Sequence, residues 1–200
     1  MNSEDLCRPV TFLVTTGIVT LILTSGPAWA TPRTYRFDEG SELVYRVTSP
    51  FHTIEGTSHR IEGQFRMDAG SPVPVIETPV RLSVDLTSLD SGNRNRDRHM
   101  RETMRAPLFP RVSLRLDHIH WETPTSRGTP GTASGSIEML GVERPVDVTL
   151  LGQRSEDRLT VEAAFEVRLE THGVERPRFL MQPIDDRVPV RFRGVAVSQP

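Results

Sequence analysis

Apolar and polar residues alternate with a period of two along most of the chain after residue 40. The four most regular runs place valine, leucine or phenylalanine on one side and charged or hydroxyl residues on the other; they cover residues 80–87, 111–117, 158–170 and 188–194. Weaker alternation covers residues 43–47, 61–67, 137–139 and 146–150. Because the side chains of a strand point alternately to its two faces, this pattern predicts about eight half-buried β-strands.

Each predicted strand has one apolar and one charged face, which is typical of antiparallel sheets with a single buried side. The charged faces exclude an outer-membrane barrel, whose outward side must be apolar to contact lipid. We therefore expect an all-β domain in which about eight antiparallel strands form a barrel with an apolar interior. A sandwich of two sheets produces the same alternation and stays open at this point.

Segments rich in Gly, Pro, Ser and Thr separate the strands and predict loops at residues 68–79 and 123–132. The pentapeptide GVERP occurs at residues 141–145 and again at 173–177, and different sequences come after the two copies. We expect both copies to connect strands, with glycine in a tight turn and proline stiffening the entry to the next strand. The segment HTIEGTSH, at residues 52–59, is expected to be a loop that enters the second strand.

The alternation is interrupted at residues 91–112, which read SGNRNRDRHMRETMRAPLFPRV. Asn93 or Asn95 can cap a short helix that runs to about residue 105 and ends before Pro107. Met100 and Met104 are four residues apart and share one face of this helix. The solvent side carries the arginines Arg94, Arg98, Arg101 and Arg105. We expect this helix, inserted between two strands, to lie as a lid or plug over one open end of the barrel.

Charge in this segment does not indicate nucleic-acid binding. Asp97 and Glu102 can pair locally with the arginines, and the whole chain has a formal net charge of −2. Proteins that bind single strands place aromatic side chains among the basic ones, and here no aromatic residue occurs before Phe109. We therefore expect no nucleic-acid partner, and we interpret the arginines as a solvated helix face.

The N-terminal residues have the pattern of an export signal. An apolar stretch at residues 12–23 is followed by GP and then by the small-residue pattern AWA at residues 28–30. Cleavage near Ala30 would leave residues 31–200 as one domain, which is then not expected to be an integral membrane protein. A leader retained as an anchor is the alternative. Cys7 is the only cysteine and lies in the leader, so the remaining chain has no thiol or disulfide.

Candidate catalytic and metal-ligating residues are few. The segment DHIHW places His118 and His120 on one side of a strand, where they continue an apolar stripe, but a metal site needs at least one further ligand. Asp97 and His99 are two residues apart, but the only candidate nucleophiles for such a pair are Ser91, Thr103 and Ser113. Neither GxSxG nor HExxH is present. The DD pair at residues 185–186 predicts a turn rather than a calcium site. We expect no metal, no cofactor and no enzymatic activity.

Two motifs resemble the YceI-like family of bacterial secreted proteins. The first is S-G-N followed by R-D-x-H-M-R, M and F-P within residues 91–110, and the second is IEMLGVERPVDV at residues 137–148. The resemblance extends from TYRF, at residue 34, to VRFRGVAV near the C-terminus. The Pro-rich loop at residues 71–79 and the second GVERP depart from the family pattern, and both are expected at the rims of the barrel.

The resemblance implies a lipocalin-like barrel, periplasmic or secreted, that holds a long apolar chain such as a polyisoprenoid, an isoprenoid quinone or a fatty-acid-like lipid. The lining is expected to be the inward-facing set Leu43, Tyr45, Val47, Phe65, Leu82, Val84, Leu114, Leu116, Phe165 and Phe192. Met100, Met104 and Phe109 are expected to gate the entrance, and Tyr45 is the inward hydroxyl best suited to a headgroup. A filled barrel that acts as a structural or protein-interaction module is the alternative, and a homodimer stays open.

Overall fold

The structure, a computed structural model, describes residues 32–49, 51–68, 73–155, 157–179 and 182–199, so the expected leader at residues 1–30 lies outside the described residues. In these ranges no helix has the length and apolar composition needed to cross a membrane. The strands are β1 (Arg33–Phe37), β2 (Glu42–Thr48), β3 (Thr53–Ser58), β4 (Ile61–Asp68), β5 (Val75–Ile76), β6 (Val80–Asp85), β7 (Arg111–Trp121), β8 (Thr129–Met139), β9 (Val142–Ser155), β10 (Arg158–Arg168), β11 (Arg178–Phe179), β12 (Gln182–Pro183) and β13 (Arg187–Ser198). The helices are η1 (Leu86–Ser88), α1 (Arg94–Thr103) and η2 (Glu170–His172).

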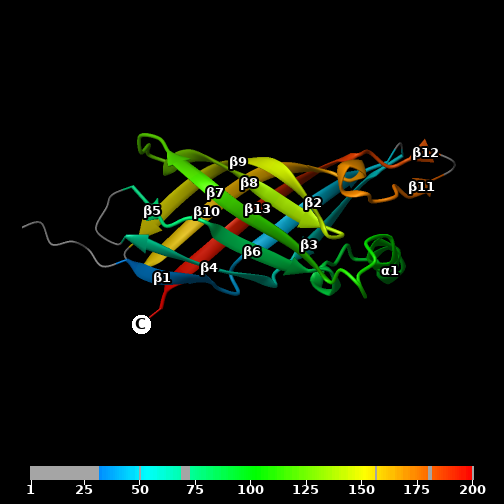
Figure 1. Cartoon of the computed structure of the whole chain (residues 1–200), viewed down its shortest axis with the longest axis horizontal. Coiled ribbons are helices and arrows are strands. Elements are labelled where there is room, and N and C mark those ends of the chain that lie inside the picture. Colours follow the sequence, from blue (N-terminus) through cyan, green and yellow to red (C-terminus); the bar gives the residue numbers. More distant parts are fainter. Residues whose placement is uncertain (1–31, 50, 69–72, 156, 180–181, 200) are drawn as a thin grey trace, which may run out of the picture.

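The strands close into one antiparallel barrel (Figure 1). Neighbours follow the order β1, β4, β6, β7, β8, β9, β10 and β13, and β13 pairs back with β1. The long strand β13 pairs with β1 through residues 196–198 and with β2 through residues 190–193. The β2–β3 pair therefore extends the β1–β4 pair toward the end of the barrel where α1 lies. The expected eight-stranded barrel with an inserted helix is confirmed, and the sandwich is excluded.

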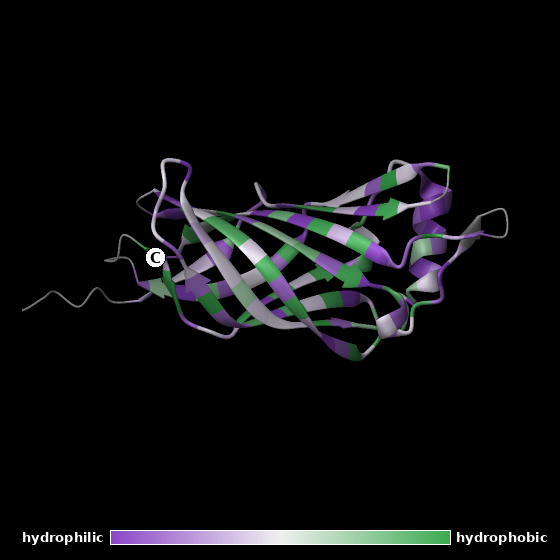
Figure 2. Ribbon diagram, turned by 90° about the horizontal axis from the view of Figure 1, so that it is seen from above, coloured by the Kyte–Doolittle hydropathy of each residue, from purple (hydrophilic) through white to green (hydrophobic). Residues whose placement is uncertain are grey.

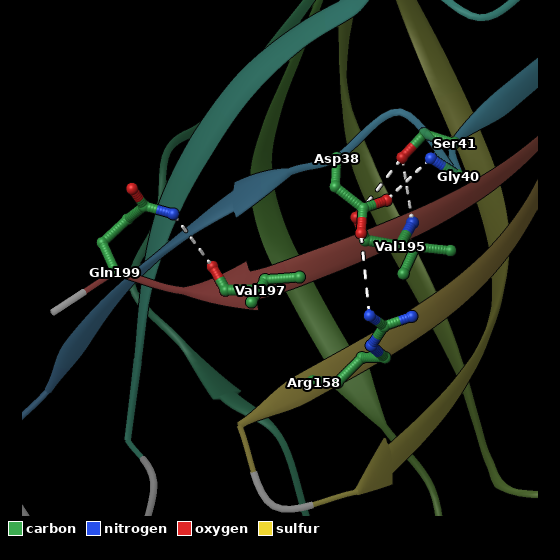
Figure 3. A network of polar contacts seen from close by, with 7 residues as sticks. All are labelled: Asp38, Gly40, Ser41, Arg158, Val195, Val197 and Gln199. Atoms are coloured by element: carbon green, nitrogen blue, oxygen red, sulfur yellow. Dashed lines mark hydrogen bonds and ion pairs between the residues drawn. The ribbon is translucent and has the colours of Figure 1, made fainter.

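A buried serine completes the hydrogen bonding where β1 passes into β2. Ser41 Oγ accepts from the Val195 amide at 3.0 Å, and the Asp38 amide donates to the Val195 carbonyl at 2.8 Å. Figure 3 shows the Ser41–Val195 contact, together with Arg158 of β10, which lies 3.9 Å from the Asp38 carboxylate. Because buried backbone groups must be paired, these bonds let β13 stay continuous while its partner changes from β2 to β1.

The apolar face of every barrel strand points inward, and the hydropathy colours alternate along the ribbons (Figure 2). On β10, for example, Leu159 is fully buried and Val167 is 5% exposed, whereas the charged residues between them face water. Beside β1 the interior is packed with aromatic rings: Tyr35 stacks on Phe65 with centroids 5.8 Å apart, and Phe37 lies 5.6 Å from Phe65. This part of the barrel is the more densely filled one.

A β-bulge between Leu116 and His118 reverses the alternation in the second half of β7. After the bulge, Ile119 and Trp121 line the interior, whereas His118 and His120 are exposed. The expectation that the two histidines continue the apolar stripe is therefore wrong. The physical reason is that an extra residue in one strand turns all later side chains to the opposite face.

Two further expectations are corrected by the strand boundaries. The segment at residues 52–59 is not a loop, because residues 53–58 form β3 and pair with β2. In the first GVERP copy only Gly141, with φ of 74°, lies in the turn, and Val142 already begins β9. The second copy is a connection, as expected: Gly173, with φ of 75°, ends η2 and the chain continues toward β11.

The bulge of β7 requires glycine at the facing position of β8, and this yields a stability prediction. A Cβ at Gly135 would collide with the Arg115 carbonyl oxygen and lie 2.8 Å from Leu116 Cα, so the backbones would have to separate. We expect Gly135→Ala to lower the free energy of unfolding by roughly 2–4 kcal/mol, measured by urea denaturation. Ser134→Ala, on the same strand, is the matched control and should change it by less than about 0.5 kcal/mol. Equal stability of the two variants would contradict the close approach.

Candidate ligand-binding site

Two apolar cavities adjoin inside the barrel. The larger, which we name the mouth cavity, lies beneath α1 and has a volume of about 300 Å³. The smaller, the inner cavity, has a volume of about 90 Å³ and extends to Trp121 and Ile76. Five side chains line both cavities and form what we name the junction: Leu43, Val84, Val112, Ile137 and Phe165. These five side chains lie at the boundary between the two cavities, and we name the two cavities together the bore.

The ten side chains expected to line the barrel all lie on the wall of this bore. Those on the mouth cavity are Leu43, Tyr45, Val47, Val84 and Phe165, and those on the inner cavity are Leu43, Phe65, Leu82, Val84, Leu114, Leu116, Phe165 and Phe192. The alternation of apolar and polar residues predicted these inward positions because the strands have no bulge there. Their contact with a ligand stays a prediction.

The entrance residues divide into two groups. Met100 and Met104 of α1 line the mouth cavity, and Met104 is only 8% exposed. Phe109 lines neither cavity. Its ring lies instead against the β8–β9 turn, within 3.1 Å of the Cβ position of Gly141. Phe109 therefore holds the α1–β7 connection against the barrel rather than contacting the bore.

Hydrogen bonds at the first turn of α1 fix the helix over the bore. Asn93 Oδ1 accepts from the amides of Asn95 and Arg96, which confirms the expected N-cap. Ser91 then ties the turn together: its amide donates to the buried Asp97 carboxylate at 3.1 Å, and its hydroxyl accepts from Arg96 Nε at 2.8 Å. These bonds orient the methionine face toward the interior.

The segment that follows η2 forms the opposite side of the mouth, a feature that sequence reasoning missed. Val174, Pro177 and Ile184 line the mouth cavity across from α1, and Figure 1 shows α1 and the β11–β12 hairpin on opposite sides of the same barrel end. Arg176 holds this segment by donating to Glu170 Oε1 at 2.7 Å and to the Ile184 carbonyl at 2.8 Å. The second GVERP motif was the only sequence signal for it.

Polar side chains of the bore are concentrated at the mouth. Tyr45, Arg96, His99 and Thr103 line the mouth cavity, whereas Trp121 is, among the described residues, the only one on the inner cavity whose side chain carries a polar atom. The bore is therefore amphipathic along its length. A molecule that fills it would place polar atoms beneath α1 and apolar atoms beyond the junction.

Tyr45 is the polar group closest to the apolar wall. Its ring covers Gly56 on the neighbouring strand, where a side chain would occupy the same space. The Tyr45 side chain lines the mouth cavity, and no described residue forms a hydrogen bond with its hydroxyl. Burial and the negative charge of Asp97 raise the pKa of this hydroxyl above its ordinary value of 10.0, with a smaller opposing effect from Arg96. Tyr45 is thus a neutral hydrogen-bond donor available to a ligand.

The remaining candidate chemistry is not brought together. Asp97 is buried and bonded to Ser91, whereas His99 lies 3.4 Å from Glu102 on the helix surface. His118 and His120 point away from the bore. Across the described ranges, no group of three or more histidine, aspartate or glutamate side chains converges in a way that could hold a metal ion.

Because the pKa of Tyr45 is raised, we expect the free energy of unfolding to fall at alkaline pH. A tyrosine that holds its proton more tightly in the folded state gives full stability below pH 10.0 and loses it as pH rises through the folded pKa. The tyrosinate absorbance that wild type has and Tyr45→Phe lacks should appear with a pH midpoint above 10.0. Above that pH, the free energy of unfolding should fall less in the variant than in wild type. A midpoint at or below 10.0 would show that the hydroxyl is not desolvated.

Several solved structures are similar to this fold. BcnA of Burkholderia cenocepacia is 15% identical, with a TM-score of 0.66 over 80% of this chain and 99% of that chain. A polyisoprenoid binding domain from Saccharophagus degradans is 17% identical, with a TM-score of 0.63 over 82% and 98% of the two chains. The YceI protein of Campylobacter jejuni is 11% identical, with a TM-score of 0.59 over 76% and 89%. At these identities the similarity shows the fold alone.

Sequence comparison with known proteins identifies the family. A search of curated proteins finds no match. The family model described as the YceI-like domain matches residues 35–196. The matched range begins in β1 and ends in β13, so it includes the whole barrel, the inserted helix and both cavities. The chain therefore belongs to the YceI-like domain family.

Proposed function

We propose that this protein binds one long apolar chain inside its barrel, without covalent attachment or chemical change, and carries it through an aqueous compartment. The proposed ligand is a polyisoprenoid, an isoprenoid quinone or a fatty-acid-like lipid. If residues 1–30 act as an export signal, that compartment is the periplasm or the exterior of a bacterial cell. Each chain has its own bore, so the proposal holds for a monomer and for a homodimer.

The arrangement of the two cavities is the observation that carries this proposal. A compact ligand would need one wide pocket, whereas here two apolar cavities meet at the five shared side chains of the junction. Apart from the polar groups at the mouth and the indole nitrogen of Trp121, the wall is hydrocarbon. Desolvation is therefore the main driving force for binding, and its contribution to the binding free energy grows with the apolar area that the ligand buries.

The size of this driving force favours a long chain over a short one. Burial of ten methylene groups gains about 8 kcal/mol. The loss of translational and rotational freedom on association costs about 4–15 kcal/mol, which can cancel that gain. A chain that fills only the mouth cavity would bind weakly, and one that passes the junction gains the additional burial needed for stable binding.

The polar groups at the mouth give the ligand a direction. Tyr45 offers a neutral hydroxyl donor, and Arg96, His99 and Thr103 stand beside the same cavity. A ligand with an oxygen acceptor at one end, such as a quinone carbonyl, can bind with that end beneath α1 and its tail toward Trp121. The Saccharophagus degradans domain of similar fold is named for polyisoprenoid binding, which supports this ligand class.

The proposal is tested by mass spectrometry of an organic extract from protein purified without denaturation or detergent. We expect one intact long-chain lipid per chain, and uptake of a fluorescent fatty acid by protein from which that lipid has been removed. Protein that yields no lipid and takes up no probe would contradict the proposal and favour a filled barrel that acts as a structural or interaction module.

A substitution at the junction tests whether ligands cross it. Val84 lines both cavities, and Val84→Phe narrows the passage between them. We expect probes long enough to reach the inner cavity to lose about 0.8 kcal/mol, or roughly fourfold in affinity, for each methylene excluded. Short probes that fit the mouth cavity should be unaffected. Val44→Phe is the matched control, because Val44 lines a depression on the outer wall and faces away from the bore.

A charge on the lid tests the role of α1. Met100→Glu places a carboxylate on the apolar wall of the mouth cavity, and burying it without a partner should weaken probe binding by about 1–3 kcal/mol. Asn95→Glu adds the same charge on the exposed side of the helix. We expect near wild-type affinity for this control, measured by fluorescence titration. Equal affinities in the two variants would show that ligands do not pass beneath α1.

A further inference from the structure

The outer face of α1 carries a stripe of arginines that the proposed ligand site does not use. Arg94, Arg98 and Arg101 follow the helical spacing of four and three residues, and Arg105, whose φ of 48° is left-handed, lies exposed just beyond the helix. At 100° per residue the three helical arginines fall within an arc of about 60°, centred roughly 130° from Met100. Figure 2 shows α1 lying across one end of the barrel. Met100 lines the mouth cavity and none of the four arginines does, so the stripe lies off the bore-facing side of the helix.

Neighbouring acids neutralise little of this charge. Glu102 lies 3.7 Å from Arg98 and also contacts His99, while Asp97 is buried and bonded to Ser91. Among the described residues, no carboxylate lies within ion-pairing distance of the other stripe arginines, Arg94, Arg101 and Arg105. The stripe therefore presents a positive surface to the solvent.

The helix dipole accounts for only part of this arrangement. Arg101 lies in the last turn, where the carbonyl groups carry partial negative charge and favour a cation. Arg94 lies in the first turn, where the amide groups carry partial positive charge and disfavour one. The charge of Arg94 therefore does not stabilise the helix.

An exposed leucine lies beside the stripe. Leu108 is 75% exposed, and its amide donates to the Arg105 carbonyl at 2.9 Å, which keeps it within one turn of that arginine. Basic side chains beside an exposed leucine match the boundary between lipid headgroups and acyl chains, where the charges contact phosphates and the leucine contacts hydrocarbon. An acidic protein surface would satisfy the arginines but gives no role to Leu108.

We propose that the outer face of α1 docks on a bilayer that contains anionic phospholipids. This inference rests on the proposed function, because docking there would bring the mouth, between α1 and the side chains of Val174, Pro177 and Ile184, next to the lipid that the bore takes up. Each arginine close to an anionic surface raises partitioning about fivefold, and salt screens this attraction over about 10 Å.

The test is co-sedimentation of the full chain with vesicles of phosphatidylcholine alone or mixed with phosphatidylglycerol. We expect binding only to the mixed vesicles, weakened by added salt. The double variant Arg94→Gln/Arg105→Gln should bind them roughly 25-fold more weakly. Arg36→Gln/Arg193→Gln removes the same charge from exposed positions on the barrel wall and should bind like wild type. Leu108→Ser should weaken binding severalfold at constant charge.

Two results would overturn the docking proposal: equal binding to both kinds of vesicle, or equal binding by the two double variants. Capture by immobilised polyglutamate without vesicle binding would also overturn it, in favour of an acidic protein partner. Fluorescent fatty-acid binding in vesicle-free solution tests the proposed function separately and should be unchanged in every variant. Loss of vesicle docking with retained probe binding therefore identifies a failure of this inference alone.

Discussion

The burial of one face of every strand inside a closed barrel is the constraint on which the rest of the structure depends. Closure through the β1–β13 pair gives each of the eight barrel strands a neighbour on both sides, so alternate side chains define the interior. Where aromatic rings from β1, β4 and β13 meet, they line the inner cavity, which is the smaller one. Beneath α1, where most of the wall consists of valine, leucine, isoleucine and methionine, the larger mouth cavity remains. The same alternation thus produces both the stable part of the barrel and its cavity.

Residues outside the regular strands decide what the bore can do. α1 interrupts the barrel between β6 and β7 and brings Arg96, His99 and Thr103 to one end of it. The segment after η2 faces the helix from the other side, held by Arg176. Toward the opposite end, the described residues of the inner cavity offer only the indole nitrogen of Trp121, and the space is smaller. These elements give the apolar barrel a polar end beneath α1 and an apolar end near Trp121.

Most of the barrel could be predicted from sequence because period-two alternation reports directly which side chains face inward. The prediction failed where one residue changed the register: the bulge after Leu116 turned Trp121 into the bore and the two histidines out of it. It also failed for β3, where Gly56 occupies an inward position and the Tyr45 ring supplies the apolar cover from the next strand. The mouth segment around Val174 was missed because it lacks regular structure, and cavity volume depends on packing that no residue pattern encodes.

The most direct measurement of the central idea, a bore occupied by a single extended chain, is a high-resolution crystal structure of protein purified without detergent or added lipid. The account predicts continuous tubular electron density that begins beneath α1, passes the junction between Val84 and Phe165, and ends near Trp121. Side chains repacked across the junction, with the mouth cavity collapsed or filled by ordered water, would contradict it.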